Sequence, residues 1–283
     1  MLPEKTQAGS QTTNNSYICC RSKGVLGTLP AEIIPYEPEA GNADEGIAAH
    51  RTHQPAGTPY IYKCISMVPV QFITHQTARF SYEESALLAL RGGCRWIQLR
   101  MKEATDDEMA PVAERLRKAC TRAGATFVVD DRVELAKDVK ADGVHLGKND
   151  MPVREARSLL GESFIIGGTA NTLDDIERLW KDSADYAGCG PLRFTVTKKN
   201  LAPLLGLDGY RAIVTGMRER GIRLPLCAIG GITPADVRPL LDAGVQGIAV
   251  SSYVLSAPDP AEAMHRLLNC DQEETEQEPS ETI

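Results

Sequence analysis

Short apolar segments alternate with longer amphipathic segments along much of the chain. Eight segments rich in β-branched or other apolar residues are bounded by Gly or polar residues, which predicts strands. They span 70–74, 95–100, 126–130, 143–147, 164–168, 186–190, 226–231 and 247–252. Each is followed by a segment with apolar residues at helical spacing. These predicted helices span 81–91, 105–123, 132–139, 152–160, 172–181, 208–220, 233–243 and 260–268.

Several predicted helices carry start signals. Ser81 is followed three residues later by Glu84, the pattern of a capping box. Pro152 lies in a first turn, and Thr233 directly precedes Pro234. Eight strand–helix repeats predict an α/β fold, a single-domain (β/α)8 TIM barrel. The rival is an open doubly wound sheet, but no G-x-G-x-x-G follows the first strand, and the strands end in the polar or Gly residues that a ring of active-site loops requires.

Composition divides the chain into three parts. Residues 1–66 have no sustained apolar period, which predicts an irregular or disordered extension. Residues 67–270, the predicted barrel, hold equal numbers of acidic and basic side chains. Residues 271–283 hold six acids and no base, which predicts a disordered acidic tail. The net charge of −7 therefore belongs mostly to the tail.

The same composition excludes several functions. No apolar run approaches the roughly 20 residues of a membrane span, and no basic block suits nucleic acid. The N-terminus lacks the apolar core of a secretory signal. The eight cysteines are scattered without a C-x-x-C pair, which predicts reduced, buried thiols in a cytoplasmic protein.

Candidate chemistry lies where strands end, because TIM-barrel active sites form there. Alternation places Gln98, Arg100 and Lys102 on one face, and such polar groups are costly inside a barrel unless they meet a ligand or acids. An Arg and a Lys together suit a phosphate or diphosphate. The alternative is a structural salt bridge to neighbouring Asp residues.

Carboxylates follow the next two strands. Asp131 and Asp150 lie at adjacent strand ends, where two carboxylates can share Mg²⁺ with water and substrate phosphate. Beside the cation pair this predicts a metal–diphosphate site. The alternative is that both residues cap helices.

Later strand ends add hydroxyl groups, glycines and a further cation. Thr169 follows two glycines, and Asn171 or Thr172 has helix capping as its alternative role. In the loop after the sixth strand, two hydroxyl groups and a cation can bind an oxyanion, namely those of Thr195, Thr197 and Lys198. The alternative is that this loop is a surface turn. Gly230–Gly231 and Ser251–Ser252 end the last two strands, where barrels often bind phosphate. Two phosphorylated ligands and Mg²⁺, without an evident nucleophile, predict a transfer in which diphosphate departs.

The residues at these strand ends resemble those of the thiamine phosphate synthase family over about 67–265. The matching segments are QLRMK, DDRVELA, ADGVHLGKNDMP, IIGGTANT, ADYAGCGPLRFTVTKKN, AIGGI and AVSS. The family joins 4-amino-2-methyl-5-hydroxymethylpyrimidine diphosphate to a thiazole phosphate, giving thiamine phosphate and diphosphate in thiamine biosynthesis. Its reaction is understood as dissociative: the bond to diphosphate breaks first, and the thiazole nitrogen then attacks the pyrimidinylmethyl cation.

The resemblance implies a role for each matching residue. The implied pyrimidine-diphosphate site comprises Gln98, Leu99, Arg100, Met101, Lys102, Asp130, Thr169 and Lys198. The implied thiazole-phosphate site comprises Thr195, Val196, Thr197, Gly231, Ser251 and Ser252. Asp131 and Asp150 are the implied Mg²⁺ ligands, and the implied catalytic residues are Arg100, Lys102 and Lys198.

Three positions depart from the family pattern. Thr169 replaces a Ser and keeps the hydroxyl. Met101 replaces a Glu and is predicted to point away from Arg100 and Lys102. Asp130 replaces an Asn and adds a negative charge, so it either faces the pyrimidine amino group or is offset by Mg²⁺ and Lys.

Other functions remain as alternatives. A thiazole tautomerase-like isomerase shares the barrel but uses a His shortly after strand 5, where this chain has Asn171. A non-catalytic phosphate-binding barrel would act through the extension or the tail. A phosphosugar isomerase or aldolase would need an acid–base pair or a Schiff-base Lys, and none is evident. The intact metal and diphosphate residues favour the synthase; its partners are two phosphorylated small molecules, and a homo-oligomer is compatible with the sequence.

Overall fold

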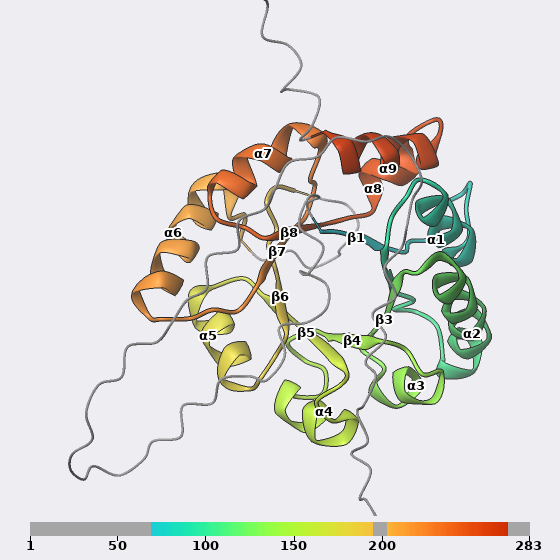
Figure 1. Ribbon diagram of the computed structural model, residues 1–283, viewed down its shortest axis with the longest axis horizontal. Helices are drawn as coiled ribbons and strands as arrows, with labels where there is room; N and C mark the ends of the chain where they lie inside the picture. The colour runs from blue at the N-terminus through green and yellow to red at the C-terminus, as the bar shows by residue number, and fades with distance from the viewer. Residues whose placement is uncertain (1–68, 195–202, 271–283) are drawn as a thin grey trace, which may run out of the picture. The chain divides into compact units, whose positions relative to one another are not determined.

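Parallel strands form the centre of the computed structural model, which describes residues 69–194 and 203–270 (Figure 1). Eight strands pair in chain order, and β8 also pairs with β1, so the sheet closes into a barrel. The strands are β1 (Val70–Ile73), β2 (Trp96–Leu99), β3 (Thr126–Asp130), β4 (Gly143–Leu146), β5 (Ile165–Ala170), β6 (Tyr186–Cys189), β7 (Leu226–Ile229) and β8 (Gly247–Val250). The predicted TIM-barrel fold is confirmed.

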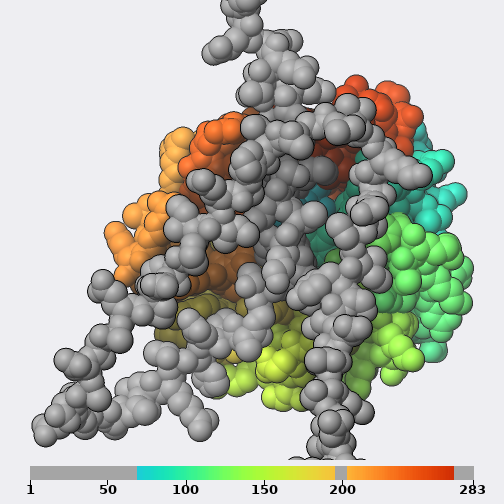
Figure 2. Space-filling view, in the orientation of Figure 1, coloured from blue at the N-terminus to red at the C-terminus, as the bar shows by residue number. Residues whose placement is uncertain are grey.

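Helices surround the strands as an outer layer. They are α1 (Tyr82–Arg91), α2 (Asp106–Ala123), α3 (Val133–Asp138), α4 (Val153–Leu160), α5 (Leu173–Lys181), α6 (Gly206–Glu219), α7 (Pro234–Asp242), α8 (Ser252–Ser256) and α9 (Pro260–Asn269). Figure 2 shows the side chains of α1 to α3 forming a continuous wall along one side of the barrel.

Helix starts follow the predicted local chemistry. Ser81 forms the expected capping box with Glu84 at α1. Thr233 forms another with Asp236 at α7, and Pro234 occupies the first turn. Thr172 caps α5 through its side chain, so the capping role considered for this residue is confirmed.

Most element bounds differ from the predicted ranges by one or two residues, and two differences, at β5 and α8, concern the strand ends. β5 continues through Thr169 and Ala170, which pair with Gly188 and Cys189 of β6. The sequence pattern predicts that this strand ends at Gly168, but the pairing to β6 extends it by two residues. The five-residue helix α8 was not predicted, because it is too short to display a helical period.

Apolar residues fill both sides of the sheet. The larger core lies between the strands and the helices, and it includes Leu99 and Met101. A smaller cluster comprises Trp96, Val128, Tyr186, Cys227 and Ala249. The alternation of side chains along each strand assigns this cluster to the barrel interior. A filled interior leaves the strand ends as the place where a ligand can bind.

Four of the five described cysteines are buried, as predicted, and Cys270 is partly buried. Cys94, Cys120, Cys189 and Cys227 are buried and form no disulfide. Burial raises the pKa of the Cys94 thiol to about 11, which disfavours the reactive thiolate. Over the ranges that the structure covers, no helix is both long and apolar enough to span a bilayer.

Candidate active site

The predicted cations lie beside a buried carboxylate at the C-terminal ends of β2 and β3. Asp130 is 5% exposed, and its Oδ1 accepts a hydrogen bond of 2.6 Å from Gln98 Nε2. Its Oδ2 lies 3.4 Å from Arg100 Nε and 3.6 Å from Lys102 Nζ. The extra negative charge of Asp130 is therefore offset by both cations. The salt bridges considered as an alternative are present, and they lie at the C-terminal mouth of the barrel, the opening at the strand ends where the ligand site is predicted.

Asp131 and Asp150 lie side by side at this mouth. The Asp131 backbone has a left-handed φ of 64°, and its N–H donates to the His145 carbonyl over 2.8 Å. The Asp150 carboxylate accepts a hydrogen bond of 2.7 Å from the Gly147 N–H. Helices α3 and α4 have no side-chain cap, so the alternative that these two residues cap helices is wrong.

The two carboxylates have opposite protonation tendencies. Burial, followed by the charge of Asp130, raises the pKa of Asp131 to about 7. Burial also acts to raise the pKa of Asp150, but hydrogen bonds from Asp131 and the Gly147 N–H outweigh it, and the pKa falls below its ordinary value. Burial acts to lower the pKa of Lys102, but the charge of Asp130, the contact with Asp131 and the charge of Asp150 outweigh it and raise that pKa above its ordinary value.

This carboxylate pair suits a hard divalent cation. Asp131 Oδ1 is buried and accepts no hydrogen bond from the residues that the structure describes. A cation beside it would satisfy that oxygen and would lower the Asp131 pKa, which burial and the charge of Asp130 raise. Within 69–194 and 203–270 no group of three or more His, Cys, Asp or Glu forms a metal site. A pair of carboxylates is the donor set that Mg²⁺ uses, because Mg²⁺ binds through one or two carboxylates and completes its shell with water and phosphate.

Glycines follow β7 at the position where the sequence predicts a phosphate loop. Gly230 and Gly231 have φ values of 100° and 73°, a left-handed region that glycine adopts at low cost. Arg193 holds this loop: it donates to the Gly231 carbonyl over 2.8 Å and pairs with Asp236 of α7. Next to this loop, after β8, Ser251 Oγ is buried without a hydrogen-bond partner among the described residues. Sequence reasoning missed Arg193 because its partners lie about forty residues away.

Other predicted positions divide into three groups. Leu99 and Met101 are buried in the outer core, as predicted for Met101, so their side chains face away from the mouth. Thr169 Oγ1 lies at the mouth, 3.1 Å from His145 Nε2. Four predicted residues lie outside the described ranges: Thr195, Val196, Thr197 and Lys198.

Asn171, the position that distinguishes the tautomerase alternative, has a structural contact. Its side-chain amide donates to the Gly190 carbonyl over 2.5 Å. This bond ties the end of β5 to the end of β6. No His stands at this position to perform the proton transfer of an isomerase.

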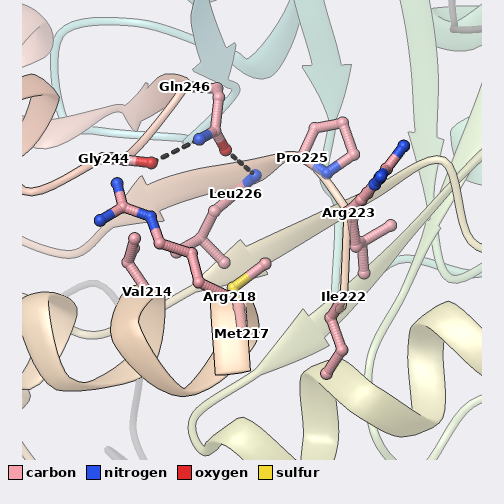
Figure 3. Close-up of a pocket in the computed structure, with 10 residues that line it drawn as sticks. Val214, Met217, Arg218, Ile222, Arg223, Pro225, Leu226, Gly244 and Gln246 are labelled. Carbon is pink, nitrogen blue, oxygen red and sulfur yellow. Dashed lines mark hydrogen bonds between the residues drawn. The ribbon is translucent and has the colours of Figure 1, made fainter. Parts of the chain in front are cut away.

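A cavity of about 290 Å³ lies away from this mouth, between α6 and the start of β7 (Figure 3). Met217, Ile222 and Leu226 give it an apolar lining, and Arg218 and Arg223 stand at its edge. Gln246 bridges the Gly244 carbonyl and the Leu226 N–H beside it. Because it adjoins the N-terminal end of a strand, this cavity is separate from the candidate active site.

The fold and the site together define a class of protein. Two cations and three carboxylates follow β2, β3 and β4, and a left-handed glycine loop follows β7, so both lie at the C-terminal ends of TIM-barrel strands. These features are typical of barrels that bind phosphorylated ligands.

Comparison with known proteins identifies the family within this class. The family model described as thiamine monophosphate synthase matches residues 70–254. The thiamine-phosphate synthase of Bacteroides thetaiotaomicron is 57% identical over 203 residues, covering 72% of this chain and 97% of that protein. That of Bacteroides fragilis is 56% identical and is covered completely. The chain belongs to the thiamine monophosphate synthase family, as the resemblance predicted.

A solved structure agrees with this assignment. The thiamine phosphate pyrophosphorylase from Pyrococcus furiosus superposes with a TM-score of 0.64 at 36% identity. The match covers 73% of this chain and 96% of that chain. Sequence and structure comparisons therefore agree on the same family.

Proposed function

We propose that this barrel condenses 4-amino-2-methyl-5-hydroxymethylpyrimidine diphosphate with a thiazole phosphate, releasing thiamine phosphate and diphosphate. The observation that carries the proposal is the meeting of Arg100 and Lys102 with a carboxylate pair at one strand-end mouth. Such a site stabilises a departing diphosphate and needs no protein nucleophile. The relatives from both Bacteroides species are thiamine-phosphate synthases, which supports the same reaction.

The proposed reaction separates bond breaking from bond formation. The C–O bond to diphosphate breaks, its electron pair leaves with the diphosphate oxygen, and the thiazole nitrogen then supplies the pair for the new C–N bond. Arg100 and Lys102 would neutralise charge on the departing group, with Lys198 as a third cation. Mg²⁺ held by Asp131 and Asp150 would supply further neutralisation of the diphosphate.

The thiazole phosphate is proposed to bind at the other side of the mouth. The Gly230–Gly231 loop offers backbone N–H groups, and Ser251 offers a buried hydroxyl oxygen without a described partner. Thr195 and Thr197 would complete this site, as the family resemblance implies. Placing the two substrates in one mouth brings the thiazole nitrogen near the cation that forms.

Product formation tests the proposal directly. Purified full-length chain is mixed with both substrates, with and without Mg²⁺, and thiamine phosphate and diphosphate are measured. Both products are expected only with the metal. Thiazole isomerisation without the pyrimidine substrate would instead support the tautomerase alternative, and phosphate binding without turnover would support the non-catalytic barrel.

Two variants test the metal assignment. Asp131→Asn and Asp150→Asn should each lower kcat by about 100-fold or more, because each removes an electrostatic stabiliser of the leaving group. The exposed Asp107 gives a matched control, and Asp107→Asn should retain full activity. Unchanged turnover in both site variants would remove the metal assignment.

A further inference from the structure

A row of polar side chains crosses the barrel interior and ends at Thr169. Gln71 Nε2 of β1 donates to the Tyr186 hydroxyl of β6 over 3.1 Å. The same hydroxyl lies 3.1 Å from His145 Nδ1 of β4, and His145 Nε2 lies 3.1 Å from Thr169 Oγ1 of β5. Gln71 is 2% exposed, Tyr186 is 0% exposed and His145 is 9% exposed, whereas Thr169 is partly exposed at the mouth.

The chemistry of the groups sets a direction along this row. The Gln71 amide nitrogen can only donate, so the Tyr186 oxygen accepts from it. The Tyr186 O–H is then available to donate to His145 Nδ1. A neutral imidazole that accepts at Nδ1 carries its proton on Nε2, and it donates that proton to Thr169 Oγ1. The Thr169 proton is not used by the row and stays available to a ligand.

The surrounding core fixes these groups in place. A side chain at Gly167 would overlap the Tyr186 ring, and one at Gly188 would crowd the His145 ring. The rings of Trp96 and Tyr186 pack edge to face, with ring centroids 5.0 Å apart. The row is therefore held by the closed barrel, and burial reduces competition from water.

We propose that Gln71, Tyr186 and His145 are positioning residues that hold the Thr169 hydroxyl as a hydrogen-bond donor to the diphosphate leaving group. The inference rests on the proposed function and on the family resemblance, which implies that Thr169 contacts the pyrimidine diphosphate. A donor fixed before the reaction stabilises negative charge as the C–O bond breaks, without reorganisation at that moment. None of the three positioning residues was singled out from the sequence.

The protonation of His145 tests the direction of the row. The full-length chain, labelled with ¹⁵N-histidine, contains five histidines, and the His145 signal is identified by its loss in His145→Leu. The nitrogen shifts are expected to show a neutral ring with its proton on Nε2. A proton on Nδ1 would reverse the direction, because Nε2 would then accept the Thr169 proton and that proton would no longer be available to a ligand. This result would overturn the proposal.

A double-mutant cycle tests whether His145 acts through Thr169. Thr169→Ala and His145→Leu should each lower kcat by about 10- to 100-fold, with the KM for pyrimidine diphosphate changed less than about threefold, because the bond strengthens in the transition state. The combined variant should be no slower than Thr169→Ala alone. Thr169→Ser keeps the hydroxyl and should retain near-normal kcat. A kcat in the combined variant that falls by the product of the two single-variant factors would overturn the proposal.

Two further variants separate positioning from the loss of any buried hydroxyl. Tyr186→Phe keeps the ring but removes the hydroxyl, so kcat should fall even if His145→Leu fails to fold. Tyr210→Phe removes another fully buried hydroxyl, which donates to the Cys189 carbonyl outside the row, and its kcat should match that of the unmodified chain. Equal losses in both variants would mean that the loss of any buried hydroxyl lowers kcat, and would overturn the positioning role. An unmodified chain that forms no thiamine phosphate would refute the proposed function. An active chain in which the His145 proton is on Nδ1 would refute only the proposed positioning of the Thr169 hydroxyl.

Discussion

Arg157 of α4 illustrates how a single buried charge is held in this barrel. Its side chain is 9% exposed, and its Nη2 lies 2.6 Å from Asp185 Oδ2. It also donates to the Phe164 carbonyl over 2.6 Å, and Asp185 accepts from the Ile166 N–H. The pair therefore joins α4 to β5 and to the turn before β6, and each partner depends on the other.

Truncating Arg157 should destabilise the fold strongly. Arg157→Met is expected to cost about 3 kcal/mol or more, because it leaves Asp185 without its cation. Arg154, on the same helix, pairs with Asp182 while 73% exposed, so Arg154→Met should cost less than about 1 kcal/mol. Urea unfolding of both variants gives the two values, and similar losses would contradict the difference in burial.

The grouping of side chains was predictable where the residues are close in sequence, and it was not predictable where they contact each other across the barrel. Strand alternation was enough to group Gln98 with Arg100 and Lys102. His145 and Tyr186 stand in the segments GVHLG and YAGCG, which indicate only buried strands. Their contact requires barrel closure and interior glycines, which a one-dimensional pattern does not show.

At the scale of elements, α7 shows how one carboxylate can serve a helix and a loop. Asp236 accepts from the Thr233 N–H over 2.8 Å, which completes the capping box. The same carboxylate pairs with Arg193, which in turn holds the Gly231 carbonyl. The position of the glycine loop is thereby tied to the start of the helix that follows it.

The contribution of Asp236 should depend on pH. Burial acts to raise its pKa, but bonds from Arg193 and Thr233 outweigh it and lower the pKa below its ordinary value. A lowered pKa means that the stabilisation is present at neutral pH and is lost as the pH falls through the folded-state pKa. Asp236→Asn should therefore be less stable than the unmodified chain at pH 7, by about 1 kcal/mol, and the difference should shrink below pH 3.8.

Asp242 gives the control on the same helix. It is 58% exposed and pairs only with Arg238 in the described contacts. Asp242→Asn should change the free energy of unfolding little at any pH. A pH-independent difference for Asp236→Asn, measured by denaturant unfolding across pH 3 to 7, would argue against the charged contact.

Element boundaries were predictable where the signal is local. Capping residues at α1 and α7 lie within three positions of the helix start, so the sequence contains the whole signal. The end of β5 depends on pairing with β6, and α8 is too short to show a period. Long-range pairing therefore explains the first difference, and element length explains the second.

For the whole molecule, barrel closure depends on its first strand. Val70 and Phe72 of β1 pair with Ile248 and Val250 of β8, and the Ile248 N–H donates to the Pro69 carbonyl. The opposite edge of β1 pairs with β2. Removing this strand would expose two sheet edges at once.

Truncations should locate where the part of the chain that is required for folding and activity begins. Deleting residues 1–66 is expected to leave kcat and the unfolding midpoint within experimental error, because β1 remains. Deleting residues 1–73 also removes β1 and should abolish cooperative unfolding and activity. A dead 1–66 deletion would mean that the extension belongs to the fold or to the site.

The interior glycines have a consequence for how this barrel can change through evolution. Gly167 and Gly188 leave the space that the Tyr186 and His145 rings occupy. A larger residue at either glycine is tolerable only when the facing ring becomes smaller. A substitution at either glycine should therefore occur together with a substitution of the facing ring, and a single substitution should be removed by selection.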